Sequence, residues 1–175
     1  MGWLSELWKY GFTDEQRAAS RAAERYVQAL NAFEQEFATL TPSEARTAAE
    51  RVLAAPRFVR VTPWQDAPPP NAELAPTLRE FFQRIRLVEI PESERCADVS
   101  HLVPLEWAPE YLSLGSTGVE HTHLAIRPND ESIYILADDV PIDKRVESVF
   151  ATVYHWLLWL ERKEELLTEP DPPVT

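Results

Sequence analysis

Hydrophobic positions in the first third of the chain recur at helical spacing. Apolar residues separated by three or four positions form one stripe: Ala19, Ala23, Tyr26, Leu30, Phe33, Phe37 and Leu40. With the capping pair Thr13 and Gln16 ahead of it, the stripe predicts one amphipathic helix of about 27 residues. A second helix is expected from the cap Thr41, with Pro42 in its first turn, to the break at Pro56. Together they predict an N-terminal helical hairpin.

Alternation of apolar and polar residues predicts a β-hairpin later in the chain. Its arms are residues 119–127 and 132–137, joined by a Pro-Asn-Asp-Glu turn at residues 128–131. The side expected to meet the core carries Thr122, Leu124 and Ile126. The other side, expected to be largely exposed to solvent, carries His121, His123, Ala125 and Arg127.

Shorter apolar runs complete the pattern. Residues 58–62 and 87–90 predict strands, and Pro76 begins a helix whose apolar positions are Leu78, Phe81, Phe82 and Ile85. Asp143 can cap a long C-terminal helix that reaches about Leu167. Its wide stripe is Val146, Val149, Phe150, Val153, Trp156, Leu157 and Leu160. The expected fold class is α+β, with a mainly antiparallel sheet, this long C-terminal helix and the N-terminal helical hairpin.

The domain boundary is expected close to a proline-rich stretch. A chain of 175 residues favours one domain with an appended helical element. Residues 63–71 contain three consecutive prolines, which predicts a helical region at 1–62, an α+β core at 63–168 and a frayed tail at 169–175. At the start, Trp3, Leu4, Leu7 and Trp8 would share one helix face. That face either docks on the body or anchors the chain to a partner or a membrane surface.

Charge is distributed unevenly along the chain. There are 29 acidic and 17 basic residues, a net charge of −12, and residues 1–60 hold eight of each sign. Residues 89–143 hold twelve acids against Arg95 and Arg127. Such a field repels phosphate backbones, which disfavours nucleic acid as a partner, and it attracts basic proteins. The alternative is that the acidity only keeps the protein soluble.

Other bulk features point to the cytoplasm. No run of 18 apolar residues is present, and the N-terminus lacks the basic and apolar regions of a secretory signal. Cys96 is the single cysteine, so no intrachain disulfide can form. We therefore expect a cytoplasmic protein without a membrane partner.

One pair of residues has the spacing of metal ligands. His121 and His123 lie two positions apart on a strand, so both imidazoles can face one ion. Gly115, six residues earlier, resembles the opening of the cupin pattern. That pattern then requires a glutamate where this chain has Arg127 or Pro128. A metal site would need a third ligand such as Glu120 or His101, so two exposed histidines are the simpler interpretation.

No sequence motif predicts catalysis. Cys96 and Ser100-His101 lack activating neighbours, and Gly115-Ser116-Thr117-Gly118 lacks the length and the lysine of a phosphate-binding loop. Asp138-Asp139 fits a solvated loop of an acidic protein better than an acid–base pair. We therefore predict no catalytic residue, no enzyme activity and no cofactor.

The second half of the chain resembles the SUKH superfamily, which includes bacterial immunity proteins and fungal cell-wall synthesis regulators. Residues 74–82 are similar to its Leu-Pro-x-x-Leu-Arg-Glu-Phe helix, and residues 111–118 to its strand ending in Gly-Ser-x-Gly. The hairpin through Tyr134, the acids Asp138-Asp139 and residues 147–150 resemble its closing strand, acidic loop and Ser-Phe helix. Residues 83–86 lack the family's Asn-Gly-Gly.

This resemblance implies a bacterial immunity protein that binds a cognate toxin and blocks it. A basic toxin, such as a nuclease, would suit the acidic segment. Aromatic residues such as Trp64 can anchor the contact. The residues expected to bind the partner are Glu120, Asp130, Glu131, Asp138, Asp139, Trp107 and Tyr111.

Two other functions remain open from the sequence. A small metal-dependent enzyme or metal-binding protein would use His121 and His123. An adaptor would use the N-terminal helical hairpin to dimerise.

Overall fold

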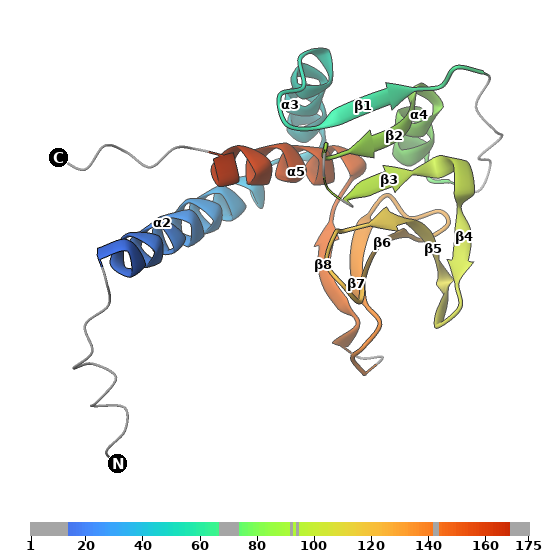
Figure 1. Cartoon of the computed structure of the whole chain (residues 1–175). Coiled ribbons are helices and arrows are strands. Elements are labelled where there is room, and N and C mark those ends of the chain that lie inside the picture. The colour runs from blue at the N-terminus through green and yellow to red at the C-terminus, as the bar shows by residue number, and fades with distance from the viewer. Residues whose placement is uncertain (1–13, 67–73, 92, 94, 142–143, 169–175) are drawn as a thin grey trace. The chain divides into compact units, whose positions relative to one another are not determined.

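The computed structural model describes residues 14–66, 74–91, 93, 95–141 and 144–168 (Figure 1). The chain divides into two compact units, residues 1–39 with 165–175, and residues 40–164. In the first unit, helix α2 (Asp14–Phe37) confirms the helix that the apolar stripe predicted. The Phe33 and Phe37 rings lie 5.3 Å apart on it. The expected cap Thr13, residues 3–8 and the tail 169–175 lie outside the described residues.

Helix α3 (Pro42–Ala54) belongs to the larger unit. The domain boundary expected near residue 62 stays a prediction. Thr41 and Glu44 form the capping box that begins this helix. Within this unit, α3 is joined to helix α4 (Pro76–Arg84) by two ion pairs. Arg84 forms an ion pair with Glu50 at 2.7 Å, and a second ion pair joins Arg46 of α3 to Glu80 of α4.

An eight-stranded antiparallel sheet forms the body of the larger unit. In spatial order its strands are β1 (Arg60–Pro63), β2 (Ile85–Glu89), β3 (Cys96–Asp98), β5 (Ala108–Ser116), β6 (Thr122–Ile126), β7 (Ile133–Ala137) and β8 (Val146–Phe150). Strand β4 (Val103–Leu105) pairs with β5 off this path, after a short 3₁₀ turn at Val99–His101. The predicted α+β class with a mainly antiparallel sheet is confirmed.

The predicted hairpin is formed by β6 and β7. Their register runs from Thr122 opposite Ala137 to Ile126 opposite Ile133. Asn129 in the connecting turn has a φ of 63°, a left-handed conformation that asparagine tolerates better than most residues. On the core-facing side Leu124 and Ile126 are buried, as expected.

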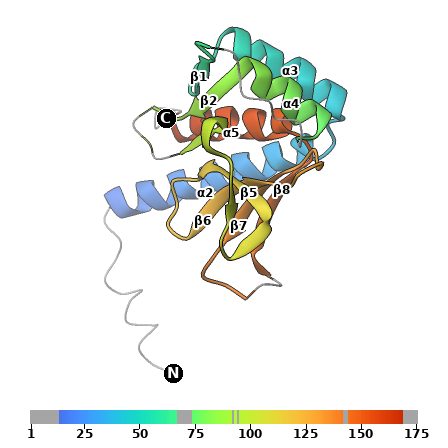
Figure 2. The same ribbon diagram turned by 90° about the vertical axis from the view of Figure 1, so that its right-hand side faces the viewer.

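Helices α3, α4 and α5 (Val153–Thr168) lie at the same end of the larger unit as β1 and β2 (Figures 1 and 2). Phe81 on α4 makes edge-on contacts with Phe82 at 5.0 Å and with Tyr154 of α5 at 5.7 Å, measured between ring centroids. All three rings are buried. Packing of large aromatic side chains therefore joins α4 to α5. No helix among the described residues is long and apolar enough to cross a membrane.

One carboxylate of α5 connects that helix to the beginning of the sheet. Glu161 accepts hydrogen bonds from the backbone N–H groups of Arg57, Phe58 and Val59 at 2.9, 3.1 and 3.0 Å. These residues directly precede β1. Because they are not paired to another strand, the carboxylate takes the place of a sheet partner for three consecutive donors.

The C-terminal helix begins later than its apolar pattern predicted. Residues 146–150 form strand β8, which pairs with β7, and the helix begins at Val153. The resemblance, which also placed residues 147–150 in a helix, was wrong on this point. Spacings of three and four also occur by chance in a short β-branched run, so periodicity alone misassigned it. The cap is Thr152, whose hydroxyl accepts from His155 N–H at 3.4 Å, and Asp143 lies outside the described residues.

The second face of the hairpin is exposed at His121 and Arg127, as expected, but its centre is buried. Ala125 is completely buried in a cluster with Leu105, Ala108, Tyr111, Tyr134 and Leu136. The sheet curves enough for the β4–β5 pair to cover this face, and register shifts interrupt three of the strand pairs from β4 to β8. Strands β3 and β4 have three residues each, which is too short for an alternating pattern to predict them from the sequence. Ile85, expected on α4, is the first residue of β2.

We expect the Glu161→Ala substitution to lower the free energy of unfolding by about 2 kcal/mol, because three backbone donors lose their acceptor. Glu161→Gln keeps one acceptor oxygen and should lose about half as much. Urea denaturation followed by circular dichroism measures both changes. Glu110→Ala, at an exposed position of β5, is the control. A Glu161→Ala loss no larger than that of the control would contradict this role.

Candidate functional site

Two histidines hold one aspartate at the end of the β6–β7 hairpin. His121 Nδ1 lies 2.9 Å from Asp138 Oδ1, and His123 Nε2 lies 2.9 Å from Asp138 Oδ2. The Asp138 backbone N–H donates a hydrogen bond of 3.0 Å to the His121 carbonyl, which holds these two segments of the chain beside each other. His121 has a φ of 61°, so it leaves the strand geometry and turns its ring toward the same carboxylate as His123.

The pKa shifts of His121 and Asp138 favour opposite charges on these two side chains. The hydrogen bond with Asp138, and then the charge of that carboxylate, raise the pKa of His121. The hydrogen bonds from His123 and His121 lower the pKa of Asp138, against a smaller effect of desolvation. The pair of His121 and Asp138 is therefore most stable as imidazolium and carboxylate, between the ordinary pKa values of the two side chains.

Trp107 lies beside this cluster. Its ring centroid is 5.4 Å from that of His123, and the Arg145 guanidinium lies 5.0 Å from the indole centroid. Arg145 also donates a hydrogen bond of 2.6 Å to the Trp107 carbonyl. The indole is half-buried, so one part of it packs on the sheet and another part remains accessible. Such an aromatic ring is suited to anchoring a protein contact.

Exposed carboxylates adjoin the indole and the histidine–aspartate cluster along the chain. Glu120 adjoins His121 in the chain and its side chain is 90% exposed, and Asp139 follows Asp138 and is also exposed. Glu106 precedes Trp107 in the turn between β4 and β5 and is exposed as well. We call Glu106, Trp107, Glu120, Asp138 and Asp139 the acidic patch. Four of the seven residues expected to bind a partner are brought together here.

The other predicted binding residues have structural contacts at the opposite end of the hairpin. Tyr111 is only 4% exposed, and Arg127 donates a hydrogen bond of 2.5 Å to its hydroxyl. Asp130 accepts from the Tyr134 hydroxyl at 2.5 Å and from the Ser132 amide at 2.9 Å. Burial would raise the pKa of Asp130, but these hydrogen bonds lower it overall. Burial of Tyr111 removes it from the set of available anchors.

Two further residues also stabilise the fold. Both carboxylate oxygens of Glu131 accept from the Thr77 backbone N–H, at 3.2 and 3.1 Å. They cap helix α4, whose N-cap residue Ala75 has no side-chain acceptor. The half-buried Trp64 donates its indole N–H to the Phe82 carbonyl at 2.8 Å, which fixes the segment after β1 on α4. These contacts within the fold account for Glu131 and Trp64, so no binding partner needs to be invoked for either residue.

The geometry of the histidine pair does not favour a metal. The ring nitrogens that converge on Asp138 are used in hydrogen bonds. Within residues 14–66, 74–91, 93, 95–141 and 144–168, no three histidine, cysteine or acidic side chains are placed to hold one ion. The side chain of His101, considered as a third ligand, lies outside the described residues.

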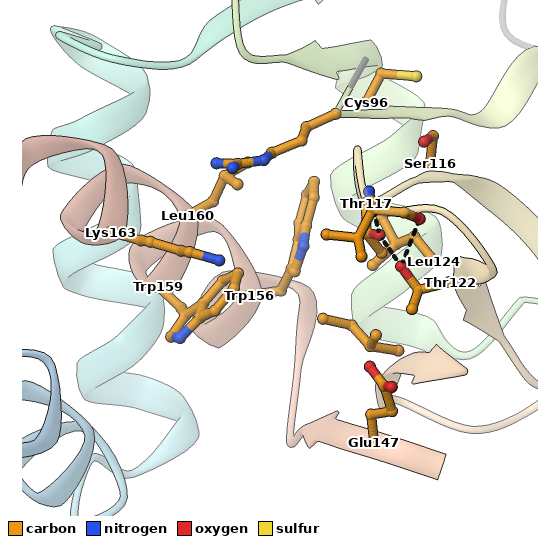
Figure 3. Close-up of a pocket in the computed structure, with 13 residues that line it drawn as sticks. Cys96, Ser116, Thr117, Thr122, Leu124, Glu147, Trp156, Trp159, Leu160 and Lys163 are labelled. Atoms are coloured by element: carbon orange, nitrogen blue, oxygen red, sulfur yellow. Dashed lines mark hydrogen bonds between the residues drawn. The ribbon is translucent and has the colours of Figure 1, made fainter. Parts of the chain in front are cut away.

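A cavity of about 270 Å³ lies on the other face of the sheet, against α5 (Figure 3). Its walls come from β3, β5, β6, β7, β8 and α5. The lining residues are Arg95, Cys96, Ser116, Thr117, Val119, Thr122, Leu124, Ile135, Glu147, Trp156, Trp159, Leu160 and Lys163. A cavity of this size is close to the lower limit of small-molecule sites.

Two glycines shape the strand side of this cavity. A Cβ atom at Gly115 would lie 2.0 Å from the backbone oxygen of Cys96, so only glycine lets β5 approach β3 this closely. Gly118 has a φ of 73°, and a Cβ there would lie 2.6 Å from Arg95 Cγ. The Gly-Ser-x-Gly sequence, too short for a phosphate-binding loop, thus places Ser116 and Thr117 at the cavity.

Several residues of these sites escaped the sequence analysis. Arg145 and Glu106 lie close to Trp107. In the sequence, the only signals for them were the position of Glu106 directly before Trp107 and the position of Arg145 in a charged segment. Trp156 and Trp159 were assigned to the apolar stripe of the C-terminal helix, and Lys163 was not singled out. Periodicity identifies a buried face but does not say where packing against it is incomplete.

We expect Asp138→Asn to lower the melting temperature most at about pH 5.5 and least at about pH 9. The raised pKa of His121 means that its stabilising charge is present below about pH 6.5 and is lost as the pH rises through the raised value. Carboxylate protonation removes the contribution only below about pH 3.8. Thermal unfolding across this range and NMR titration of the His121 ring test the prediction. An unchanged His121 pKa in the variant would contradict it.

We expect Gly115→Ala to destabilise the protein by more than about 3 kcal/mol, because its methyl group meets backbone atoms that cannot move aside. Gly118→Ala should cost about 1–2 kcal/mol, since the backbone conformation is strained but its neighbour is a flexible side chain. Chemical denaturation of both variants gives the order. Equal losses, or a larger loss at Gly118, would refute this assignment.

No protein-family model, curated protein or solved structure matches this chain. The resemblance to the SUKH superfamily therefore rests on the sequence pieces quoted above. Any function assigned to this chain therefore depends on the geometry of the acidic patch and of the cavity.

Proposed function

We propose that this chain is a non-enzymatic immunity protein that binds a basic protein toxin through the acidic patch and blocks it. The observation that carries the proposal is that Glu106, Glu120 and Asp139, all exposed, adjoin in the chain the residues Trp107, His121 and Asp138, which the structure brings together through His123. The carboxylates attract the partner, and the indole provides a contact that excludes water. The resemblance to the SUKH superfamily implies the same kind of function.

The charge distribution supports a basic partner. Residues 89–143 contribute twelve acids and two bases, and one of those bases, Arg95, forms an ion pair with Glu164. The other, Arg127, packs on the Tyr111 and Tyr134 rings at the far end of the hairpin. At the acidic patch, Arg145 and the His121 imidazolium balance part of the negative charge, and the exposed Glu106, Glu120 and Asp139 add three carboxylates, so long-range attraction would accelerate encounter with a cationic surface.

The histidine–aspartate cluster gives the patch a fixed geometry. Asp138 is held from two sides by His121 and His123, so it stays oriented without needing the partner. A preorganised carboxylate loses less conformational entropy on binding than a freely rotating one. Glu120 and Asp139 extend from the two segments that this cluster joins. We place the action of the protein in the cytoplasm, consistent with a single cysteine and no disulfide.

A charge-reversal experiment tests the proposal. The chain is immobilised, proteins retained from its native lysate at low salt are identified, and each is expressed alone to find one that arrests growth. Co-expression of the wild-type chain should restore growth, because binding blocks the toxin. The triple variant Glu106→Lys, Glu120→Lys and Asp139→Lys should fail to restore it, and its affinity should fall at least about 100-fold.

The matched control has the same change in net charge at another place. Glu24, Glu34 and Glu36 are exposed on α2, and their replacement by lysine should lower the affinity by less than about fivefold. Trp107→Ala should weaken binding without altering its salt dependence. Equal effects of the two triple variants would show that net charge, and not the acidic patch, matters. Absence of any growth-arresting partner would overturn the immunity function.

A further inference from the structure

The cavity against α5 lies on the opposite face of the sheet from the acidic patch. Alternation along β6 directs Thr122 and Leu124 into the cavity and His123 and Ala125 to the other face. On β7, Ile135 lines the cavity in the same way. A ligand can therefore bind in the cavity without meeting the surface proposed for the toxin.

Apolar and aromatic side chains form most of the cavity wall. Trp156 and Leu160 of α5 are 3% and 4% exposed, and Leu124 of β6 is 2% exposed. Figure 3 shows the Trp156 ring between α5 and the strand wall that carries Thr117, with the half-buried Trp159 beside it. Two flat indole rings among aliphatic side chains suit a flat, apolar ring compound.

The two cations of the lining already have partners within the chain. Arg95 forms an ion pair with Glu164, and the side chains of these two residues are only 26% and 13% exposed. Lys163 Nζ lies 4.5 Å from the centroid of the Trp159 ring, so its charge rests on the face of that indole (Figure 3). An anionic ligand would compete with Glu164 for Arg95 and with Trp159 for Lys163. Neither cation therefore favours an anion in the cavity.

The lining does not favour a cation either. Glu147 is the one acidic side chain among the described residues of the lining, and it is exposed on β8. Water screens the attraction of an exposed carboxylate for a cation, and Arg95 and Lys163 in the same lining repel one. A ligand of either charge thus loses its hydration without gaining a buried partner of opposite charge, whereas a neutral ligand has no such penalty.

Hydroxyl groups of the strand wall are also used within the fold. Thr122 donates to the Val119 carbonyl at 2.9 Å, and the Thr117 and Thr122 hydroxyls form a hydrogen bond with each other. Thr117 Oγ1 accepts from the Val119 N–H at 3.3 Å, and Ser116 Oγ accepts from the Gly118 N–H at 3.1 Å. Because these polar atoms already have partners in the chain, they hold water in the cavity less strongly, and an apolar ligand displaces it more easily.

We propose that this cavity binds a small, neutral aromatic compound. The ring of the ligand lies between α5 and the strand wall, against Trp156, Trp159 and Leu124. Apolar cavities of about 150 Å³ bind benzene. The cavity volume of about 270 Å³ therefore leaves room for one ring or for two fused rings with a short neutral side group.

Three probes of similar size and with the same ring test the proposal on the full chain. Indole-3-ethanol, indole-3-acetate and tryptamine carry a neutral, a negative and a positive side group, and isothermal titration calorimetry gives their affinities. Indole-3-ethanol should bind at least about fivefold more tightly than either charged probe, because only the charged probes have to lose the hydration of an ion. In two-dimensional NMR spectra, its addition should shift the indole N–H signals of Trp156 and Trp159 and leave that of Trp107 unchanged.

A matched pair of valine substitutions tests the location. Val119 and Val103 are both 57% exposed, but only Val119 lines the cavity. Val119→Trp places a bulky ring at the cavity and should weaken binding of indole-3-ethanol at least about tenfold, whereas Val103→Trp should change it less than about twofold. Thermal melts establish that both variants are folded. Failure of all three probes to bind at millimolar concentration, equal or tighter binding of a charged probe, shifts confined to Trp107, or equal losses in the two variants would each overturn the proposal.

Discussion

The larger unit depends on the contact between one carboxylate of the last helix and three successive backbone amides that precede the first strand. Glu161 lies more than a hundred residues from its partners in the chain, so the interaction closes the whole unit. It positions β1 at the edge of the sheet and leaves α5 lying over the strands. The aromatic contacts of α4 with α5 then have a fixed helix to pack against. The cavity between α5 and the sheet follows from that placement.

The two faces of the curved sheet have taken different roles because side chains alternate along each strand. One face packs against α5, with a space left between Leu124, Trp156 and Trp159. The other face closes on itself through the β4–β5 pair and presents Trp107 at its margin. A single hairpin thus contributes to a concave hydrophobic site and to a charged surface. Because the residues of the two sites alternate in sequence, no contiguous segment encodes either one.

Sequence patterns predicted the elements that are long or have strong end signals. The α2 stripe, the capping box at Thr41 and the β6–β7 alternation are all found in the structure. The patterns failed at residues 146–150, where a short apolar run fits both the helical and the strand spacing. They also failed for three-residue strands such as β3, which form only because neighbouring strands pair with them. Sequence also identified the acidic and histidine residues of the hairpin. It did not reveal that Asp138 is shared by two imidazoles, because that requires the left-handed turn at His121. The cavity arises from imperfect packing between distant elements, which no local pattern records.

Among the described residues, strand β8 ends the sheet with one side of its backbone not paired to another strand, and Val146 and Val149 on it are 45% and 53% exposed. A β-branched edge strand of this kind is a template on which a second copy of the same strand can add. Repulsion between copies that each carry a net charge of −12 opposes such stacking. The acidic composition thus opposes association between copies of the chain, in addition to the role proposed for it in attracting a cationic partner. Neutralising it, by acidification or by a polycation, would remove the barrier to assembly into extended sheets.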